Sequence, residues 1–524
     1  MNSILKKVQG YFSANLALIG ITVLGLLLRL WHLTSISLWH DEAFSALLIK
    51  YPWGEMMYRI GLDVHPPMYY IFLRIWSYVF GNSLFALRGM SVLFGVATVI
   101  AVYYFVLYTF KNRKAALIAA LLIAINPFQV QYVTEARMYT MGAFFAVLSA
   151  LSLVAALRTQ SLYYANVANQ VLQAQLKKKY LWYYAIFVIA EVIIIYTHYY
   201  LLFTAAAIGA YGILYCLINF KTQFKKWGWV VLSGIAIGIL FLPWLKVFLF
   251  QYKQVGAGYW IPPMDIWSIP DTLWTLLLQL PSHHWEMALI TLITLVVIIR
   301  VLWKYTETEK WLVTAGFIAP FAGSILFFLL SKLQHSDSSV YLVRYFIFCS
   351  AFYSIFIALF LSKLKIKQIG NALLVVLVIL NLFSVWRYWN DLQVQTKPGM
   401  AGAAKFLTAN VEPEQKIFIG SSFEFFNFKY YNKTSVKPLL FTDGHYVHDL
   451  PHFAGTAILT DDDLVLNFTD GTRHGDTVWL LWTNGFGGSK PNVPKNWTQV
   501  DEKGFAEVRP YVGTWIIVTE YKVN

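Results

Sequence analysis

Eleven apolar segments, each about as long as a membrane is thick, constrain this chain more than any other feature. A helix rises about 1.5 Å per residue, so roughly twenty apolar residues cross a hydrocarbon core of about 30 Å. The chain has 524 residues, of which 58% are hydrophobic and only 13% are charged, and this composition is not that of a soluble domain. The predicted spans are 14–33, 84–110, 115–133, 138–157, 180–197, 199–219, 228–249, 286–303, 311–331, 341–361 and 369–386. The sequence therefore predicts an α-helical polytopic membrane protein.

The loops between these segments predict how the chain crosses the membrane. Lys and Arg cluster in every second loop: at Lys6 and Lys7, at 111–114, at Arg158 with 177–179, and at 221–226, 304–310 and 363–367. Basic loops stay in the cytoplasm, so the N-terminus is predicted there, and eleven spans place the C-terminus outside. The net charge of +14 is spread over these loops and forms no basic face, so no nucleic-acid partner is expected.

The composition changes to that of a soluble domain after residue 386. Apolar runs of the β type occur at 416–420, 456–460, 477–482 and 514–521, separated by Gly, Pro and Asp, and the stretch AGAAKFL before them reads as helical. We therefore expect two parts: a membrane module over 1–386, and a small extracytoplasmic α/β domain over 387–524. Residues 34–80 read as short helices that lie in the interface on the outer face of the membrane module.

Ionisable side chains gather in the loops opposite the basic ones. Those on the predicted outer side are Asp41 and Glu42 in SLWHDEAF, His65 in DVHPPMYY, Glu135 and Arg137 in YVTEARMYT, His198 in YTHYY, and Arg344 in YLVRYF. Ionisable residues at membrane depth are costly and by default indicate a functional site. A proline pushes the residue before it out of the helical region, so His65, which precedes two prolines, is presented by a stiff turn.

Each of these residues also has a purely structural interpretation. Asp41 and Glu42 could stabilise the start of a helix near Ala43, where carboxylates suit the helix dipole. His65 could be an incidental loop residue, and Glu135 with Arg137 a surface pair beside an aromatic belt.

The same holds for the residues nearer the spans. His198 could belong to an interfacial aromatic belt, and Arg29, Arg88 and Arg344 could extend their side chains to the headgroups. Glu191 in the span 180–197 could pair with His198 or with another helix.

The order of these motifs is more specific than any one of them. A span, then W-x-D-E, HPPMYY, FGNSLFALRGMS, EARMYT, THYY and a late RYF resemble the protein O-mannosyltransferase-like glycosyltransferases of the GT-C superfamily, to which the aminoarabinose transferases of lipid A are related. The resemblance is good over roughly the first 215 residues and looser up to the last predicted span. It implies a GT-C fold of about eleven membrane helices.

The resemblance also implies an activity and residue roles. Such enzymes transfer a sugar from a polyprenyl monophosphate to an acceptor on the outer face. It implies that Asp41 acts on the acceptor, with Glu42 as its acidic neighbour, and that Arg137 belongs to the E-A-R motif. The aminoarabinose transferases tend to have Lys at the position of His65, whereas protein mannosyltransferases have His, so lipid A is not assigned as the acceptor.

Chemistry suggests how the remaining residues divide. Transfer needs a base for the acceptor hydroxyl and cationic groups for the leaving phosphate, and one base with direct displacement inverts the anomeric carbon. We expect Asp41 to be the base, Arg137, His65 and Arg344 to bind the donor phosphate, and Glu135, His198 and Tyr69 to support the site. Glu42 is expected to bind the acceptor or position a cation.

Several questions stay open at this point. Asp41 and Glu42 could hold a divalent cation, but two carboxylates at this spacing do not define a site. The acceptor is a protein, lipid or glycan hydroxyl. The alternative function is a transporter or flippase of a lipid-linked or polar substrate, which predicts charges near mid-membrane and internal repeats.

Overall fold

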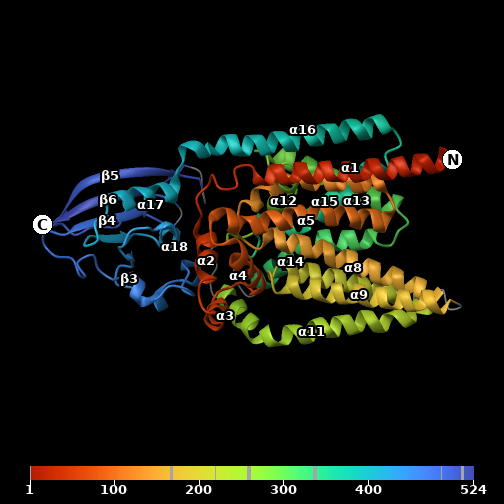
Figure 1. Cartoon of the computed structure of the whole chain (residues 1–524), viewed down its shortest axis with the longest axis horizontal. Helices are drawn as coiled ribbons and strands as arrows, with labels where there is room; N and C mark the ends of the chain where they lie inside the picture. Colours follow the sequence, from red (N-terminus) through yellow and green to blue (C-terminus); the bar gives the residue numbers. More distant parts are fainter. Residues whose placement is uncertain are drawn as a thin grey trace. The chain divides into compact units, whose positions relative to one another are not determined.

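The computed structural model describes residues 2–165, 169–218, 220–256, 261–333, 339–485, 487–508 and 513–524. Helices dominate the first three quarters of the chain, and a sheet follows (Figure 1). The helices are α1 (Asn2–Leu30), α2 (His40–Leu48), α3 (Trp53–Leu62), α4 (Met68–Phe80), α5 (Leu84–Phe110), α6 (Arg113–Ile125), α7 (Pro127–Val133), α8 (Tyr139–Ala165), α9 (Gln170–Ile195), α10 (Leu201–Ile218), α11 (Phe220–Gly256), α12 (Ser268–Leu277), α13 (His284–Lys304), α14 (Lys310–Leu333), α15 (Ile347–Ser362), α16 (Lys367–Leu392), α17 (Gly399–Asn410) and α18 (Ser422–Tyr431).

The chain divides into two compact units that are not the two expected from the sequence. The first, here called the helical unit, comprises Met1–Trp31, Met90–Thr134 and Met138–Trp386. The second, here called the mixed unit, comprises His32–Gly89, Glu135–Arg137 and Arg387–Asn524. The predicted interfacial segment 34–80 and the E-A-R motif thus group with the C-terminal domain and not with the membrane helices.

The helical unit carries the membrane spans. Within the described residues, eight helical segments are long and apolar enough to cross a membrane, and the bent pair α6–α7 adds a ninth if it is one span. Each of them overlaps a predicted span, and Figure 1 shows the long helices running roughly parallel. The predictions 14–33 and 180–197 fall on α1, whose apolar part is the shorter stretch Asn15–Leu30, and on α9. The protein is a multi-pass membrane protein, and the number of eleven spans stays a prediction.

The predicted span 115–133 is broken by its own sequence. Asn126 ends α6, and its side chain accepts a hydrogen bond from the Gln129 N–H at 2.9 Å, which begins α7. Pro127 takes the first position of α7, where its missing N–H costs nothing. The two helices consequently meet at an angle of 51°.

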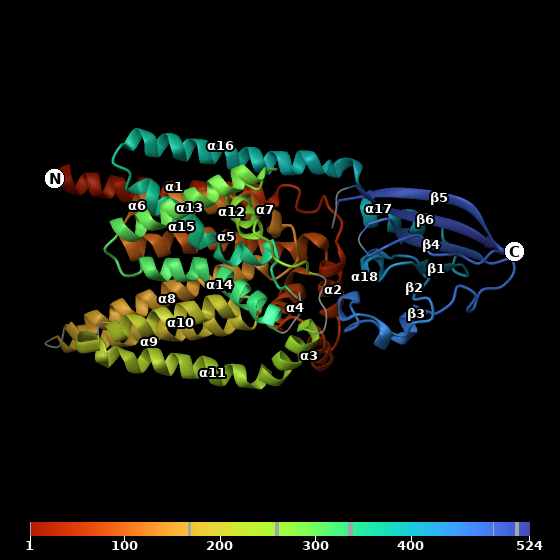
Figure 2. The same cartoon turned by 180° about the vertical axis from the view of Figure 1, so that it is seen from behind.

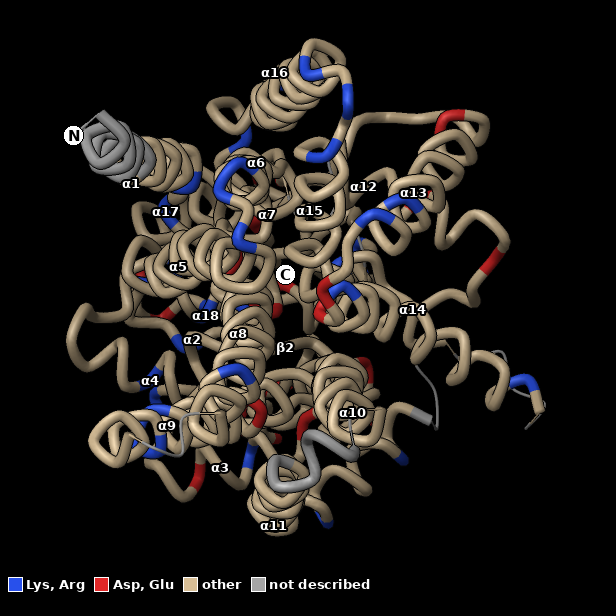
Figure 3. The backbone as a smooth tube through the Cα atoms, turned by 90° about the vertical axis from the view of Figure 1, so that its right-hand side faces the viewer, with Lys and Arg blue, Asp and Glu red and all other residues tan. Residues whose placement is uncertain are grey.

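Two polar side chains of the helical unit, those of Arg29 and Glu191, are buried and have partners that the sequence does not identify. The prediction that Arg29 reaches the headgroups is wrong: Arg29 is fully buried and donates hydrogen bonds to the carbonyls of Ile123 and Ala124 at 3.0 and 2.8 Å. Glu191 is also buried and accepts a hydrogen bond from Ser149 on α8, so its partner is another helix. Basic residues mark helix ends such as those of α6 and α16 (blue in Figure 3).

The C-terminal part of the mixed unit is an α/β domain with one sheet. Its strands are β1 (Lys416–Ile419), β2 (Pro438–Phe441), β3 (Leu464–Val465), β4 (Thr477–Thr483), β5 (Trp497–Glu507) and β6 (Thr514–Val523). They are ordered β3-β2-β1-β4-β6-β5; β1 to β4 are parallel, and β6 runs antiparallel to both β4 and β5. In the register, Phe418 lies opposite Leu439 and Leu480, and Leu480 lies opposite Thr519. Phe418, Val478, Leu480, Trp497 and Tyr521 form the centre of its core.

Two short elements join this domain to the rest of its unit. Helix α17 begins at Gly399, whose φ of +50° and whose contact with Glu507 leave no room for a side chain. The Glu507 carboxylate accepts the Met400 N–H at 3.0 Å and so stabilises the start of the helix. Helix α18 lies beside α2 (Figure 2), and the Tyr431 hydroxyl accepts a hydrogen bond from the Leu38 N–H at 2.9 Å.

Candidate active site

The site begins with the first turn of α2. Trp39 is extended, the helix starts at His40, and Asp41 and Glu42 follow in the first turn, where carboxylates suit the helix dipole. Adjacent helical residues point about 100° apart, so the two carboxylates face different surroundings. Asp41 keeps part of its surface exposed, whereas Glu42 is fully buried.

Glu42 forms a buried ion pair with Arg88 of α5. The guanidinium donates from Nε and Nη2 to the two carboxylate oxygens at 2.8 and 2.7 Å, and neither side chain is exposed. Arg88 also donates to the carbonyls of Leu33 and Ile36 at 2.8 and 2.9 Å. The prediction that Arg88 reaches the headgroups is therefore wrong. The pair ties α2 to α5 and to the segment before α2.

The E-A-R segment is attached to α2 through Ala136 and Arg137. Glu42 accepts the Ala136 N–H at 2.7 Å. The buried Arg137 donates from Nη1 to the Asp41 carbonyl at 3.3 Å, the Ser45 hydroxyl at 3.1 Å and the Tyr70 hydroxyl at 3.3 Å. A buried, permanently charged group is thus held directly beside the turn that carries Asp41.

His65 links Arg137 to an acid that the sequence did not single out. Its Nε2 lies 3.3 Å from Arg137 Nη2, and its Nδ1 lies 3.0 Å from Asp63 Oδ2. Burial acts to raise the pKa of Asp63, but the hydrogen bond from His65 and the electrostatic effects of His65 and Arg137 outweigh it and hold the pKa below its usual value. Asp63 is therefore an anion at neutral pH.

Tyr69 and Tyr70 form the aromatic wall of this site at the start of α4. Their rings meet edge to face with centroids 5.7 Å apart, and both are fully buried. Burial raises the pKa of both hydroxyls, so they are neutral donors. Among the described residues, the Tyr69 hydroxyl has no hydrogen-bond partner. A buried hydroxyl left unsatisfied is a natural contact for a polar substrate.

His198 and Arg344 belong to the helical unit. The His198 ring packs 4.6 Å from that of Tyr345, and its Nδ1 accepts the Tyr200 N–H at 3.1 Å. Arg344 lies in the short helix η1 (Val343–Phe346) that leads into α15. The predicted site residues thus fall into two groups. The mixed unit contains Asp41, Glu42, His65, Tyr69, Glu135 and Arg137. The helical unit contains Arg344 and also His198, which packs against Tyr345, the residue after Arg344.

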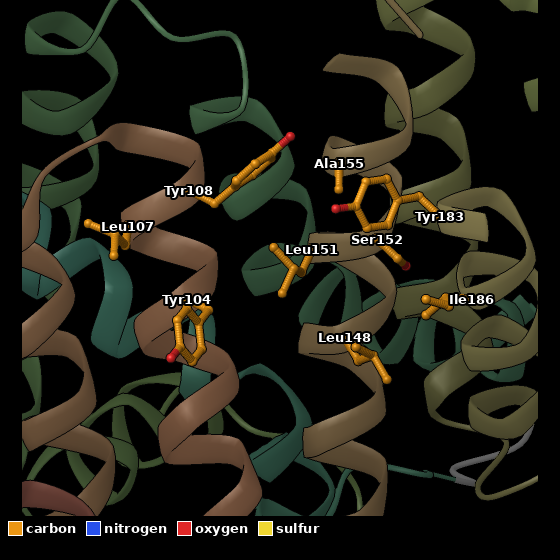
Figure 4. A pocket seen from close by; sticks show the side chains of 9 residues that line it. All are labelled: Tyr104, Leu107, Tyr108, Leu148, Leu151, Ser152, Ala155, Tyr183 and Ile186. Carbon is orange, nitrogen blue, oxygen red and sulfur yellow. The ribbon is translucent and has the colours of Figure 1, made fainter. Parts of the chain in front are cut away.

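Two further features bear on ligands. Within the described parts of the chain, no three His, Cys, Asp or Glu side chains are grouped so that they could hold a metal ion. Figure 4 shows an apolar pocket of about 330 Å³ between α5, α8 and α9, with Tyr104, Tyr108, Leu151 and Tyr183 among the side chains that line it. The side chains labelled there include no predicted site residue, so the polar cluster of the mixed unit is the candidate active site.

Comparison with known families matches a stretch of the chain that contains several of its sequence motifs. Residues 64–246 match the family model described as dolichyl-phosphate-mannose-protein mannosyltransferase, and this stretch contains HPPMYY, EARMYT and THYY. Over this stretch, about a third of its length, the chain is similar to the dolichyl-phosphate-mannose-protein mannosyltransferases. No curated protein sequence matches it.

Solved structures of ArnT share the fold of this chain. ArnT from Cupriavidus metallidurans bound to undecaprenyl phosphate matches with a TM-score of 0.62 at 10% identity, over 96% of this chain and 97% of that one. The apo state of the same protein matches with a TM-score of 0.58 at 10% identity, over 97% and 98%. The archaeal oligosaccharyltransferase AglB from Archaeoglobus fulgidus, in complex with an inhibitory peptide and a dolichol-phosphate, matches with a TM-score of 0.48 at 13% identity, over 90% and 69%.

The sequence alone does not predict the part that three residues play in the cluster. Arg88 was interpreted as a headgroup contact, and Asp63 and Tyr70 were not singled out. Asp63 stands two residues before His65 in DVHPP, so its proximity to the imidazole was a usable signal. The pairing of Arg88 with Glu42 joins residues 46 positions apart, and a single sequence gives no sign of it.

Proposed function

We propose that this protein is a glycosyltransferase of the GT-C superfamily that moves a sugar from a polyprenyl-phosphate-linked donor to a hydroxyl of a protein, lipid or glycan on the outer face of the membrane, with inversion. The observation that carries the proposal is the cluster itself: a partly exposed carboxylate, Asp41, on a turn held by the buried cation Arg137. ArnT in its solved complex binds undecaprenyl phosphate, which is a lipid of the proposed donor class.

In the proposed mechanism Asp41 is the general base. It takes the proton from the acceptor hydroxyl, whose oxygen then bonds to C1 of the sugar. The bond between C1 and the phosphate oxygen breaks with its electron pair, and polyprenyl phosphate leaves. One displacement from the face opposite the phosphate inverts the anomeric carbon.

Arg137 and His65 are proposed to act on the phosphate side. A buried guanidinium is a fixed positive charge in a surrounding of low dielectric, where it stabilises the negative charge that develops on the leaving group. Tyr69 is proposed as a donor to the sugar or phosphate because its hydroxyl is buried in the same cluster. Arg344 remains a predicted donor-phosphate ligand, and His198 and Glu135 remain predicted supporting residues.

Glu42 receives a different role from the one its sequence predicts. Both of its oxygens accept hydrogen bonds, from Arg88 and from Ala136. This geometry favours a positioning role over contact with an acceptor or a cation, because the carboxylate is already neutralised and fully buried. We therefore assign to Glu42 the task of holding the E-A-R segment against α2.

A donor panel tests the proposal. The purified full-length protein in lipid is incubated with polyprenyl-phosphate sugars and candidate acceptors, with and without divalent cations, and released polyprenyl phosphate is measured. Release from one donor by wild type and its loss in Asp41→Asn support the proposal and name the sugar. No release from any donor would turn the assignment toward the transporter reading.

A further inference from the structure

The hydrogen bonds around His65 determine which of its nitrogens carries the proton. A guanidinium has only donors, so the contact between Arg137 Nη2 and His65 Nε2 at 3.3 Å requires a lone pair on Nε2. The proton of the neutral ring then lies on Nδ1, which is 3.0 Å from Asp63 Oδ2. Asp63, His65 and Arg137 thus form a chain in which each group fixes the next.

We propose that Asp63 is a positioning residue of this glycosyltransferase, which holds His65 in the tautomer that accepts from Arg137 and so fixes the guanidinium beside the Asp41 turn. This inference rests on the proposed function, because it gives the fixed guanidinium a part in donor binding. It adds a residue outside the predicted catalytic and phosphate-binding set.

The local backbone supports this arrangement. Asp63 ends α3 in an extended conformation, with φ of −81° and ψ of −162°, and His65 precedes two prolines that keep it extended. The acid and the imidazole therefore stand on a short, stiff link between α3 and α4. Their side chains are 14% and 18% exposed, so water competes little with the hydrogen bond.

The charged groups around Asp63 favour the same protonation state. His65 and Arg137 keep its pKa low against the effect of burial, so it is an acceptor only. His40 and His452 also face it electrostatically; burial lowers the pKa of each, and Asp63 opposes that effect. Protonated His65, or its other tautomer, would place an N–H against the N–H groups of Arg137.

A double-mutant cycle separates positioning from an independent role. We expect Asp63→Asn and His65→Gln each to lower kcat/KM for the donor about tenfold to hundredfold, chiefly through a higher donor KM, as loss of a supporting hydrogen bond does. If Asp63 acts through His65, the double variant is no worse than the more damaged single variant. The proposal would be overturned if the loss of kcat/KM in the double variant equalled the product of the losses in the two single variants.

A matched control and a second readout keep the test independent of turnover. Glu55→Gln removes a carboxylate from the partly exposed pair with Arg59 on α3 and is expected to leave donor KM unchanged. Histidine labelled with nitrogen-15 in the full chain reports the tautomer, and the signal lost in His65→Gln belongs to His65. Wild type should show protonated Nδ1 and unprotonated Nε2 at neutral pH, and Asp63→Asn should show a mixture.

The outcomes distinguish the two proposals. A wild-type spectrum with Nε2 protonated would overturn the role of Asp63 whether or not any donor is turned over, and it needs no Asp63 variant to fold. Turnover without coupling between Asp63 and His65 would also overturn that role while leaving the proposed function in place. Absence of turnover with the expected tautomer would count against the proposed function alone.

Discussion

Asp41 and Glu42 are chemically alike neighbours with opposite surroundings. The helix turns about 100° between them, so one carboxylate is partly exposed at the site and the other is enclosed by Arg88 and Ala136. The sequence predicts both acids at the site and a separate role for each, but it does not predict the pairing of Glu42 with Arg88, because Arg88 comes from a distant part of the chain. The types and spacing of residues indicate where a polar cluster lies, whereas the role of each residue depends on its partners in the folded protein.

Removal of the Arg137 cation should weaken donor binding. We expect Arg137→Ala to lower the affinity for polyprenyl phosphate at least about tenfold, because the phosphate loses a charge-assisted partner worth about 1.5–3 kcal/mol. Arg137→Lys keeps the charge but loses the planar guanidinium, so its affinity for polyprenyl phosphate should lie between those of wild type and Arg137→Ala. Binding is measured with labelled polyprenyl phosphate, and unchanged affinity in Arg137→Ala would refute the assignment.

At the scale of elements, the sequence predicts the strands and helices that have a local apolar pattern. It does not predict those that depend on contacts with distant parts of the chain. The predicted strands at 416–420, 477–482 and 514–521 correspond to β1, β4 and β6, and AGAAKFL lies in α17. The prediction of a strand at 456–460 is wrong: this run is buried without joining the sheet, so its apolar character reflects packing alone.

The missed strands have physical reasons. Strand β5 lies at the edge of the sheet and is exposed over most of its length, so it lacks the apolar alternation that predicts a strand. Strands β2 and β3 are only four and two residues long. In the segment 41–60, Pro52 comes directly before α3, and Gly54 lies inside that helix without breaking it.

The ion pair between α2 and α5 should be essential for the stability of the mixed unit. We expect Arg88→Met to lower the free energy of unfolding by about 3–5 kcal/mol, because it leaves the Glu42 carboxylate buried without its partner. Arg387→Met, which removes an exposed pair with Asp391, is the matched control and should cost at most about 1 kcal/mol. Equal thermal unfolding temperatures for the two variants would contradict the account.

Helix α18 carries a buried acid whose ionisation should affect stability. Burial, and then the charge of Glu507, raise the pKa of Glu424 to about 8, and the Asn427 hydrogen bond opposes them. In the unfolded chain this carboxyl has its ordinary pKa of about 4.5, so the free energy of unfolding should fall as pH rises from about 4.5 to about 8.

Removing this ionisation should flatten that part of the pH dependence. Glu424→Gln cannot ionise and retains an oxygen that accepts from Asn427. We expect it to raise the unfolding temperature at pH 8 and to change it little at pH 4. Thermal unfolding of both proteins across this range is the measurement, and identical slopes for variant and wild type would contradict the raised pKa.

At the scale of the whole molecule, the predicted orientation can be tested with single cysteines. Cys216 and Cys349, the only cysteines of the chain, are both buried, so an added thiol should dominate labelling. We expect an impermeant maleimide to label Asp443→Cys in intact cells, and Lys365→Cys only after the cells are permeabilised, because basic loops stay in the cytoplasm. The reverse pattern would invert the predicted topology and place the active site inside.

The most direct test of the central claim separates binding from turnover in Asp41→Asn, with the donor that the panel identifies. If Asp41 is the general base, the variant should bind polyprenyl phosphate within about twofold of wild type but release it from the donor about 10²–10⁴ times more slowly. Single-turnover measurement with saturating acceptor gives the rate, and equilibrium binding gives the affinity. Release at a near wild-type rate would contradict the account.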